Sequence, residues 1–395
     1  MRLREELAES VSGNCGALVA DALRSVPRHL FLPGLPPEQV YSDEALVTKR
    51  GADGLPRSSS SQPALMASML DQLALAPGHR VLEIGAGTGY NAALIRHIVG
   101  PSGAVVSIDI DLDTVEEARE HLAAAGYPDV TVLCRDGAEG AAEHAPFDRL
   151  IATVGLSDLS PAWMTQLGPE GRMVVPVDLH GPMLCAALER EDGHWASRAV
   201  EPCGFIKVRG ALAGSAHAVL LMEELTVHLP ERRDIDQTSL TEALSGGPGV
   251  ILPTDVAAGP PQVMWGLHPW LCGRDPRACE VIGNLVGLPI GSRGRLHGSF
   301  GLVSGGSAAL LTAGEGSTLA VAGYGADAGS LASALAEAVQ DWDAAGRPAT
   351  KGLHVDAYPA GAEVPSRTGM VIDRPQTRFA VYHACPLPLA ASGSS

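Results

Sequence analysis

The first half of the chain alternates between short apolar runs and amphipathic segments of helical period. Residues 63–75 (PALMASMLDQLAL) place Leu65, Met69, Leu70 and Leu73 on one helical face. Apolar runs of strand length follow at 80–87, 104–111, 130–137, 147–155 and 173–177, with helix-like segments after the first two. Strands that alternate with helices predict an α/β fold with a doubly wound, mostly parallel sheet. Residues 179–225 are typical of antiparallel strands that close this sheet.

The pattern changes near residue 225, where the chain becomes rich in Gly, Pro, Ala and Ser. It still contains strand-like runs (GSFGLV, AALLTA, STLAVAGY and RFAVYHA) and one clear amphipathic helix at 328–346. A length of 395 residues also exceeds what one ordinary domain needs. We therefore expect a doubly wound domain at 1–228 and a C-terminal α+β domain at 229–395.

Charge and hydropathy narrow the class of partner. The chain has 28 Lys and Arg residues and 45 Asp and Glu residues, so its net charge is 28 − 45 = −17. This charge argues against nucleic acid, and against a polyanionic membrane surface, as a partner. An acidic surface instead favours a basic peptide. No apolar run approaches the roughly 20 residues that span a bilayer, and the N-terminus lacks a signal-peptide pattern. We expect a cytoplasmic protein without a membrane partner.

The seven cysteines are scattered, odd in number and contain no CxxC pair, which favours reduced and mostly buried thiols. His268, Cys272 and Cys279 lie close in sequence and leave a zinc site open. A structural zinc site needs more ligands at regular spacing. We therefore expect no metal.

The segment Glu83-Ile84-Gly85-Ala86-Gly87-Thr88-Gly89 stands where the first strand turns into a helix. A glycine turn at the carboxyl edge of an open α/β sheet lets the backbone approach a ligand closely. A dinucleotide fingerprint requires GxGxxG, whereas position 90 here is Tyr. Thr88 and Tyr90 are more typical of helix-start residues than of catalysts.

Two further strand ends carry carboxylates. Asp109 ends the second strand, where it can accept both hydroxyls of a ribose, and Asp136-Gly137 follows the third strand, within reach of an adenine amino group. Each carboxylate taken alone is better explained as a helix cap or part of a turn. Together with the glycine turn they predict a nucleoside site.

Six motifs resemble those of protein-L-isoaspartate O-methyltransferases, which are class I S-adenosylmethionine-dependent enzymes. They are VPRHLF (26–31), YSDEAL (41–46), SSSQPALMASML (59–70), VLEIGAGTGY (81–90), RDGAEG (135–140) and APFDRLIAT (145–153). The resemblance covers residues 1–225 in consistent order. It implies a Rossmann-like fold and a peptide or protein (iso)aspartate carboxyl O-methyltransferase that converts S-adenosyl-L-methionine to S-adenosyl-L-homocysteine.

The resemblance also assigns site residues. Ser61 matches the family's active-site serine, because SSSQP stands where the family has Thr-Ile-Ser-Gln-Pro. The expected cofactor-binding set is Ser59, Ser60, Ser61, Glu83, Gly85, Ala86, Gly87, Asp109, Ile110, Asp136 and Gly137. The run of four serines, which by composition alone is typical of a linker, then becomes part of the site. The substrate carboxylate is ionised at neutral pH, so we expect Ser61 to position it rather than to deprotonate it.

Departures from the family pattern bear on the substrate. Arg57-Ser58 replaces the family's Gly-Gln pair, and Leu46-Val47-Thr48 replaces Leu-Pro-Ile. The segments VTKRGADGLPRSSSSQP, GTGYNAALI, SIDID and AWMTQL, together with the extension beyond 225, resemble a sub-group tied to ribosomal peptide clusters with lanthipeptide cyclases or ATP-grasp ligases. The resemblance implies an enzyme that methylates an aspartate in a constrained, macrocyclic ribosomal peptide, whose ester collapses to an aspartimide. A general isoaspartate repair enzyme and a non-catalytic nucleoside-sensing module remain alternatives.

The C-terminal region concentrates aromatic residues in VMWGLHPWLCGRD (263–275). Such a cluster is compatible with the core of a small domain. It is also compatible with a surface that docks a peptide or a second subunit, because tryptophan often anchors interfaces.

Overall fold

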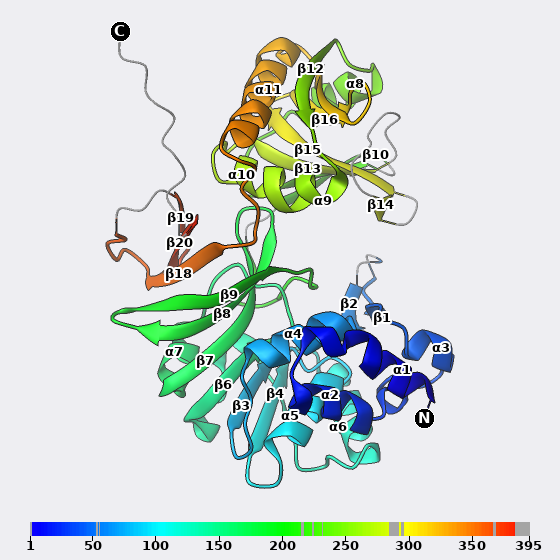
Figure 1. Ribbon diagram of the computed structural model, residues 1–395, viewed down its shortest axis with the longest axis vertical. Coiled ribbons are helices and arrows are strands. Elements are labelled where there is room, and N and C mark those ends of the chain that lie inside the picture. The colour runs from blue at the N-terminus through cyan, green and yellow to red at the C-terminus, as the bar shows by residue number, and fades with distance from the viewer. Residues whose placement is uncertain are drawn as a thin grey trace.

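The computed structural model describes residues 2–52, 54, 56–214, 217–222, 225–230, 232–283, 292–293, 296–365 and 369–383. Two lobes are stacked along the long axis of the molecule (Figure 1). The lower lobe in this view contains the N-terminus and the sheet with the parallel strands, and the upper lobe contains an antiparallel sheet. No helix among the described residues is long and apolar enough to cross a membrane.

The lower lobe is built on a ten-stranded sheet in the order β19-β20-β18-β9-β8-β7-β6-β3-β4-β5. Its parallel part consists of β3 (Arg80–Ile84), β4 (Ala104–Asp109), β5 (Thr131–Cys134), β6 (Phe147–Ala152) and β7 (Leu167–Asp178). The strands β8 (Met183–Glu191) and β9 (His194–Pro202) continue it antiparallel. The doubly wound α/β sheet expected from the sequence is therefore confirmed, and it is a mixed sheet with four parallel and five antiparallel strand pairs.

Helices cover both faces of this sheet. They are α1 (Arg2–Val11), α2 (Ala17–Ser25), α3 (Pro37–Val40), α4 (Pro63–Gln72), α5 (Tyr90–Val99), α6 (Leu112–Ala124) and α7 (Pro161–Gln166), with short 3₁₀ turns η1 (Ser12–Asn14), η2 (Arg28–Phe31), η3 (Gly137–Glu139) and η4 (Ala142–His144). On one face Ile95 of α5 and Val115 of α6 pack against Val81 and Val105. On the other face Trp163 of α7 belongs to the second core cluster. Alternate side chains of a strand point to opposite faces, which explains why the sheet supplies two separate cores.

The upper lobe is an antiparallel sheet in the order β10-β11-β13-β15-β16-β17-β12, with β14 paired to β15. The strands are β10 (His217–Met222), β11 (Leu225–Leu229), β12 (Val250–Ala257), β13 (Ala278–Gly283), β14 (Ser292–Arg293), β15 (Leu296–Ser304), β16 (Ser307–Ala313) and β17 (Thr318–Tyr324). The helices are α8 (Gln237–Ser245), α9 (Pro260–Gln262), the π-helical turn η5 (Val263–Leu267), α10 (His268–Cys272) and α11 (Ala328–Ala344). Leu335 of α11 and Leu240 of α8 belong to separate core clusters. The expected α+β character of this region is confirmed.

Strand pairing departs from the expected division at residue 228 in two respects. β10 and β11 already belong to the upper sheet. After the upper lobe the chain returns, and β18 (Leu353–Pro359), β19 (Gly369–Asp373) and β20 (Thr377–His383) extend the lower sheet beyond β9. The upper lobe is thus inserted between two strands of the lower sheet, so that two chain segments connect the lobes.

The aromatic segment of the upper lobe has mixed exposure. Val263, Leu267 and Leu271 belong to a buried core that also contains Trp342, whereas Trp265 is only half-buried. His268, Cys272 and Cys279 are each buried. Among the described residues no group of three or more His, Cys, Asp or Glu side chains is arranged to hold a metal ion.

Candidate active site

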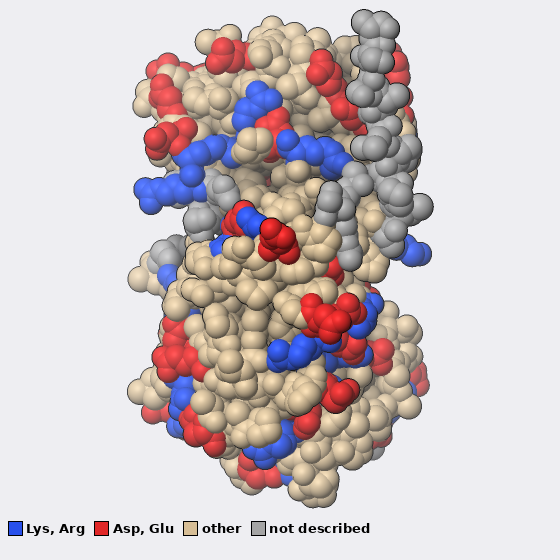
Figure 2. Space-filling model, turned by 90° about the vertical axis from the view of Figure 1, so that its left-hand side faces the viewer, with Lys and Arg blue, Asp and Glu red and all other residues tan. Residues whose placement is uncertain are grey.

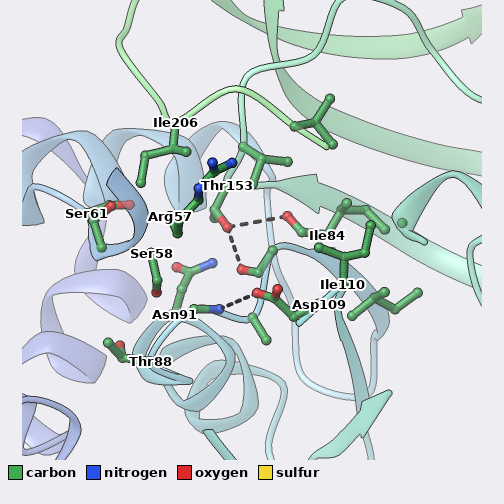
Figure 3. Close-up of a pocket in the computed structure, with 18 of the residues that line it drawn as sticks. Arg57, Ser58, Ser61, Ile84, Thr88, Asn91, Asp109, Ile110, Thr153 and Ile206 are labelled. Carbon is green, nitrogen blue, oxygen red and sulfur yellow. Dashed lines mark hydrogen bonds between the residues drawn. The ribbon is translucent and has the colours of Figure 1, made fainter. Parts of the chain in front are cut away.

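A pocket lies at the carboxyl ends of β3, β4 and β6, where the sequence places the glycine turn (Figure 3). Its lining consists of Arg57, Ser58, Ser59, Ser60, Ser61, Met66, Ile84, Gly85, Ala86, Gly87, Thr88, Tyr90, Asn91, Ile108, Asp109, Ile110, Gly137, Thr153, Val154, Ile206, Lys207, Val208 and Arg209. Nine of the eleven predicted site residues are in this set, and Glu83 and Asp136 are not.

The glycine turn between β3 and α5 forms the pocket floor because it has no side chains to fill the space. Gly85, Gly87 and Gly89 have φ values of 101°, 51° and 86°, in the left-handed region that favours glycine. A Cβ atom at Gly85 would lie 2.8 Å from Oγ1 of Thr153, and one at Gly87 would lie 3.3 Å from the carbonyl oxygen of Ser59. Glycine therefore allows the turn to pack closely against Thr153 and the serine segment.

Asp109 lies at the end of β4 with its carboxylate in the pocket (Figure 3). Its Oδ2 accepts a hydrogen bond of 3.0 Å from the backbone N–H of Gly87, and its Oδ1 accepts one of 3.3 Å from that of Asp111. Burial raises the pKa of this carboxyl, and the hydrogen bond from Gly87 opposes that rise. Each oxygen keeps a second lone pair, so the carboxylate can still accept hydrogen bonds from a vicinal diol. Ile110 follows it in the lining.

Glu83 lies beneath the lining rather than in it. Its fully buried carboxyl group accepts hydrogen bonds of 2.8 Å from Nδ2 of Asn91 and 2.5 Å from the hydroxyl of Ser107. Burial raises the pKa of this carboxyl to about 7, despite the two hydrogen bonds. Glu83 thus orients Asn91, which belongs to the pocket lining and whose buried Oδ1 has no hydrogen-bond partner among the described residues. An orphaned buried acceptor in a pocket wall indicates a place for a ligand donor.

Asp136 is also directed away from the lining, although Gly137 beside it is part of the wall. Its carboxylate accepts hydrogen bonds of 2.9 Å from the N–H of Ala138 and 2.8 Å from that of Ala211. The group therefore joins η3 to the segment that follows β9. The adenine contact expected of Asp136 stays a prediction.

The serine run is a strand rather than a linker. β2 (Pro56–Ser60) pairs antiparallel with β1 (Leu46–Arg50), with Ser60 opposite Leu46 and Ser59 opposite Val47. Ser58 and Ser60 are buried, and Ser61 lies at the edge of the pocket (Figure 3). The backbone pairing holds the segment in one register beside the glycine turn.

A buried arginine fixes the end of this strand. Arg28 has no exposed surface, and its guanidinium donates to the carbonyl oxygens of Val40 (2.9 Å), Ser42 (3.0 Å) and Ser61 (3.1 Å). It also donates a hydrogen bond of 3.3 Å to the hydroxyl of Ser60. The rigid fork of an arginine suits this task, since its five donors point in fixed directions.

Asp43 fixes the start of the following helix from the same side. Its carboxylate accepts hydrogen bonds of 2.8 Å from the N–H of Ala64 and 3.0 Å from Nε2 of Gln62. Pro63 occupies the first turn of α4, which satisfies the preference for proline at that position. Ser61 is therefore held between Arg28 and a helix N-terminus capped by Asp43.

The opposite wall of the pocket is an extended segment after β9, residues 203–213, which we call the strap and which the sequence motifs do not predict. Two backbone hydrogen bonds join the strap to Gly155. The N–H of Gly155 donates to the carbonyl oxygen of Ile206, and the N–H of Val208 donates to the carbonyl oxygen of Gly155, each over 2.8 Å. Lys207 forms an ion pair of 3.1 Å with Asp178, and Arg209 pairs with Asp111. No local motif marks this segment, because each of its partners comes from a distant part of the chain.

Arg57 and Thr153 are two further lining residues that the sequence motifs do not assign. Arg57 lies between Ser61 and Thr153 in the view of Figure 3. The hydroxyl of Thr153 donates a hydrogen bond of 2.7 Å to the carbonyl oxygen of Gly85. The position of Thr153 at the end of β6 was the available signal, because parallel strand ends meet at one edge.

Comparison with known proteins gives a consistent assignment. Residues 7–213 match the family model for protein-L-isoaspartate(D-aspartate) O-methyltransferase. The chain is 36% identical to a protein-L-isoaspartate O-methyltransferase from Methanopyrus kandleri over 215 residues, which cover 53% of this chain and 92% of that protein. It is also 36% identical to the second such enzyme of Archaeoglobus fulgidus over 209 residues, with coverage of 53% and 90%.

A solved structure of a protein-L-isoaspartate O-methyltransferase aligns with a TM-score of 0.52 at 23% identity and covers 89% of this chain and 96% of its own. That likeness is one of fold. Because the family model ends at residue 213, the alignment must include much of the upper lobe. The chain therefore belongs to the protein-L-isoaspartate O-methyltransferase family of protein carboxyl methyltransferases.

Proposed function

We propose that the protein transfers a methyl group from S-adenosylmethionine to the carboxylate of an isoaspartyl residue in a peptide or protein. The observation that carries this proposal is the position of Ser61, which Arg28 holds at the edge of a pocket shaped for a nucleoside. Membership of the family supports the reaction class.

The residues of the pocket fit the cofactor. S-adenosylmethionine supplies an electrophilic methyl group on a sulfonium when it is bound. Asp109 offers carboxylate oxygens to the ribose hydroxyls, and the glycine turn admits the ligand against the backbone. The orphaned Oδ1 of Asn91 would accept a hydrogen bond from the ammonium group of the methionine part, and Arg57 would attract its carboxylate.

The acceptor needs no general base, because an aspartyl-type carboxylate with a pKa of about 3.9 is ionised at neutral pH. The hydroxyl of Ser61 donates one hydrogen bond to a carboxylate oxygen and leaves the other oxygen free to attack. A single bond is favourable, since stronger stabilisation of the free carboxylate would slow the reaction. The bound cofactor would supply the methyl group and keep the electron pair of the broken bond, so no residue of this chain has to move a proton. Catalysis then depends on alignment.

A second candidate is an ordinary aspartyl residue in a cyclised ribosomal peptide. Arg57 favours it, since this cation lines the pocket where the family resemblance expects a Gly-Gln pair. After methylation the next backbone nitrogen attacks the ester carbonyl, loses its proton and expels methanol, which gives an aspartimide. A constrained ring would hold that nitrogen close to the ester.

Mass spectrometry separates the candidates. The protein and S-adenosylmethionine are incubated with an isoaspartyl peptide, with the matched aspartyl peptide and with a cyclised precursor peptide. A gain of one methyl group on the isoaspartyl peptide supports the first proposal. A methyl gain followed by loss of methanol on the cyclised peptide alone supports the second. Cofactor binding without any methyl gain indicates a non-catalytic nucleoside-binding module and refutes both.

A further inference from the structure

A second cavity lies between the two lobes and shares a wall with the active-site pocket. It encloses about 250 Å³ and is lined from below by Asp178 and the strap and from above by the upper lobe. Lys207 of the strap belongs to the lining of both cavities. We call this cavity the interlobe cleft. Figure 2 shows that the molecule narrows at the level where the lobes meet.

The strap separates the two cavities by the alternation of its side chains. Ile206 and Val208 line the active-site pocket, whereas Phe205 lines the interlobe cleft. This follows from the extended backbone that pairs with Gly155, because neighbouring side chains of an extended segment point to opposite faces. A peptide that crosses the strap at Lys207 therefore passes from one cavity to the other.

The upper wall of the cleft offers aromatic and apolar surface. Trp265 and Met264 contribute from η5, and Phe300 from β15, where it stacks on His268 with ring centroids 4.0 Å apart. Burial lowers the pKa of His268 to about 3, so its ring is neutral at pH 7 and adds to the aromatic wall. Trp265 is half-buried, which leaves part of the indole accessible from the cleft.

We propose that the interlobe cleft binds the peptide residues that flank the methyl-accepting residue, and that it takes one large apolar or aromatic side chain. This inference rests on the proposed function, since it places the acceptor carboxylate at Ser61. The cleft volume is below the roughly 300–1,000 Å³ of a complete ligand site, which suits one or two side chains of an extended peptide. An extended chain advances about 3.3–3.6 Å per residue, so the anchoring side chain lies a few positions from the acceptor.

Charge adds a second criterion for the peptide. The cleft lining contains the ion pair between Lys207 and Asp178, whose charged atoms lie 3.1 Å apart. The protein as a whole carries a net charge of −17. Acidic residues beside the anchor therefore weaken binding, and basic residues are accepted.

The test uses 12-residue acceptor peptides with one isoaspartyl residue, alanine elsewhere and a single phenylalanine two to five positions away on either side. A matched aspartyl series and an isoaspartyl tripeptide complete the set. The wild-type protein should methylate one spacing with kcat/KM at least about 10-fold above the all-alanine peptide. Trp265→Ala should remove that preference while leaving kcat/KM for the tripeptide and the Kd for S-adenosylhomocysteine unchanged.

Ile251→Ala is the control, since Ile251 is an exposed apolar residue of β12 at the far edge of the same upper sheet. It should retain the phenylalanine preference. Should Trp265→Ala lose its circular-dichroism signal, Met264→Ala tests the same upper wall of the cleft in the same way. Absence of any spacing preference in the wild type, or a preference that survives both substitutions, would overturn the inference.

Two further outcomes are distinguished by direct binding. Fluorescence anisotropy with labelled peptides, in the presence of S-adenosylhomocysteine, measures the affinity of the protein for each peptide. This affinity can be measured even if no peptide is methylated, so failure of the proposed reaction does not hide the result. Peptide affinity that depends on phenylalanine and on Trp265 supports the cleft in either case. If Trp265→Ala instead converts a dimer to a monomer in size-exclusion chromatography without changing peptide affinity, the cleft is a subunit interface and the inference fails.

Discussion

The guanidinium of Arg28 donates a hydrogen bond of 3.1 Å to the carbonyl oxygen of Ser61, from a position with no exposed surface. The residues are 33 positions apart, and the same guanidinium also binds Val40, Ser42 and Ser60. One buried cation thus fixes both the entrance segment and the serine segment. The position of the serine hydroxyl depends on this contact rather than on the serine run alone.

Replacement of Arg28 by Met should therefore damage stability and rate together. It leaves buried carbonyl groups without donors, and we expect a loss of about 3 kcal/mol or more in the free energy of unfolding. Urea unfolding measures this loss. Arg24→Ala is the matched control, because Arg24 forms only an exposed ion pair with Glu5 at 3.7 Å and should change stability little. Equal effects of the two substitutions would refute the role of Arg28.

Ser61→Ala should slow methyl transfer by about 10- to 100-fold, the equivalent of one hydrogen bond to a charged group. The affinity for S-adenosylhomocysteine should change little, because the hydroxyl acts on the acceptor. Single-turnover rates and calorimetry separate the two effects. Ser68→Ala serves as the control, since Ser68 lies on α4 outside the pocket lining. Its hydroxyl donates a hydrogen bond of 2.6 Å to the carboxylate of Glu201. An unchanged rate for Ser61→Ala would remove Ser61 from the mechanism.

Asp109→Ala should weaken the binding of S-adenosylhomocysteine by roughly 10-fold or more, because it removes the acceptor for the ribose hydroxyls. Calorimetry measures this affinity. Asp113→Ala provides the comparison, since Asp113 is an exposed carboxylate that pairs with Lys49 at 2.9 Å. If both variants bind the ligand with wild-type affinity, the ribose assignment is wrong.

Arg57→Gln tests the methionine end of the cofactor. Removal of this cation should weaken the binding of S-adenosylhomocysteine by about 10-fold, because a charge-assisted bond to the amino-acid carboxylate is lost. The binding of methylthioadenosine, which lacks that carboxylate, should not change. Calorimetry with both ligands gives the comparison. A loss of affinity for both would show that Arg57 maintains the shape of the pocket instead.

Glu83 predicts a pH dependence of stability. Burial raises the pKa of its carboxyl from 4.5 to about 7, so between these values the folded chain keeps a proton that the unfolded chain has lost. The free energy of unfolding therefore falls as pH rises through this window, by roughly 3 kcal/mol in total. Glu83→Gln carries no such charge. Its stability relative to the wild type should increase between pH 5 and pH 8 in urea titrations, and a constant difference would contradict the assignment.

Much of the lower lobe was predictable because its signals are local. The alternation of strands and helices, the glycine turn and the position of Asp109 at a strand end each depend on a few consecutive residues. These residues also form the pocket floor, as expected. The direction of the Glu83 side chain could not be predicted in this way, because its place in the motif is compatible with a side chain in the pocket or in the interior.

The sequence by itself determined the fold class of both regions and, through family motifs, predicted the location of the site. Only the tertiary structure decided how Ser61 is held, what forms the opposite wall and where the lobes join. Arg209 and Asp111 are 98 positions apart, and β18 pairs with β9 only after the chain has completed the upper lobe. Such contacts arise from packing between distant segments, whose free energy depends on the whole fold and leaves no periodic pattern in the local sequence.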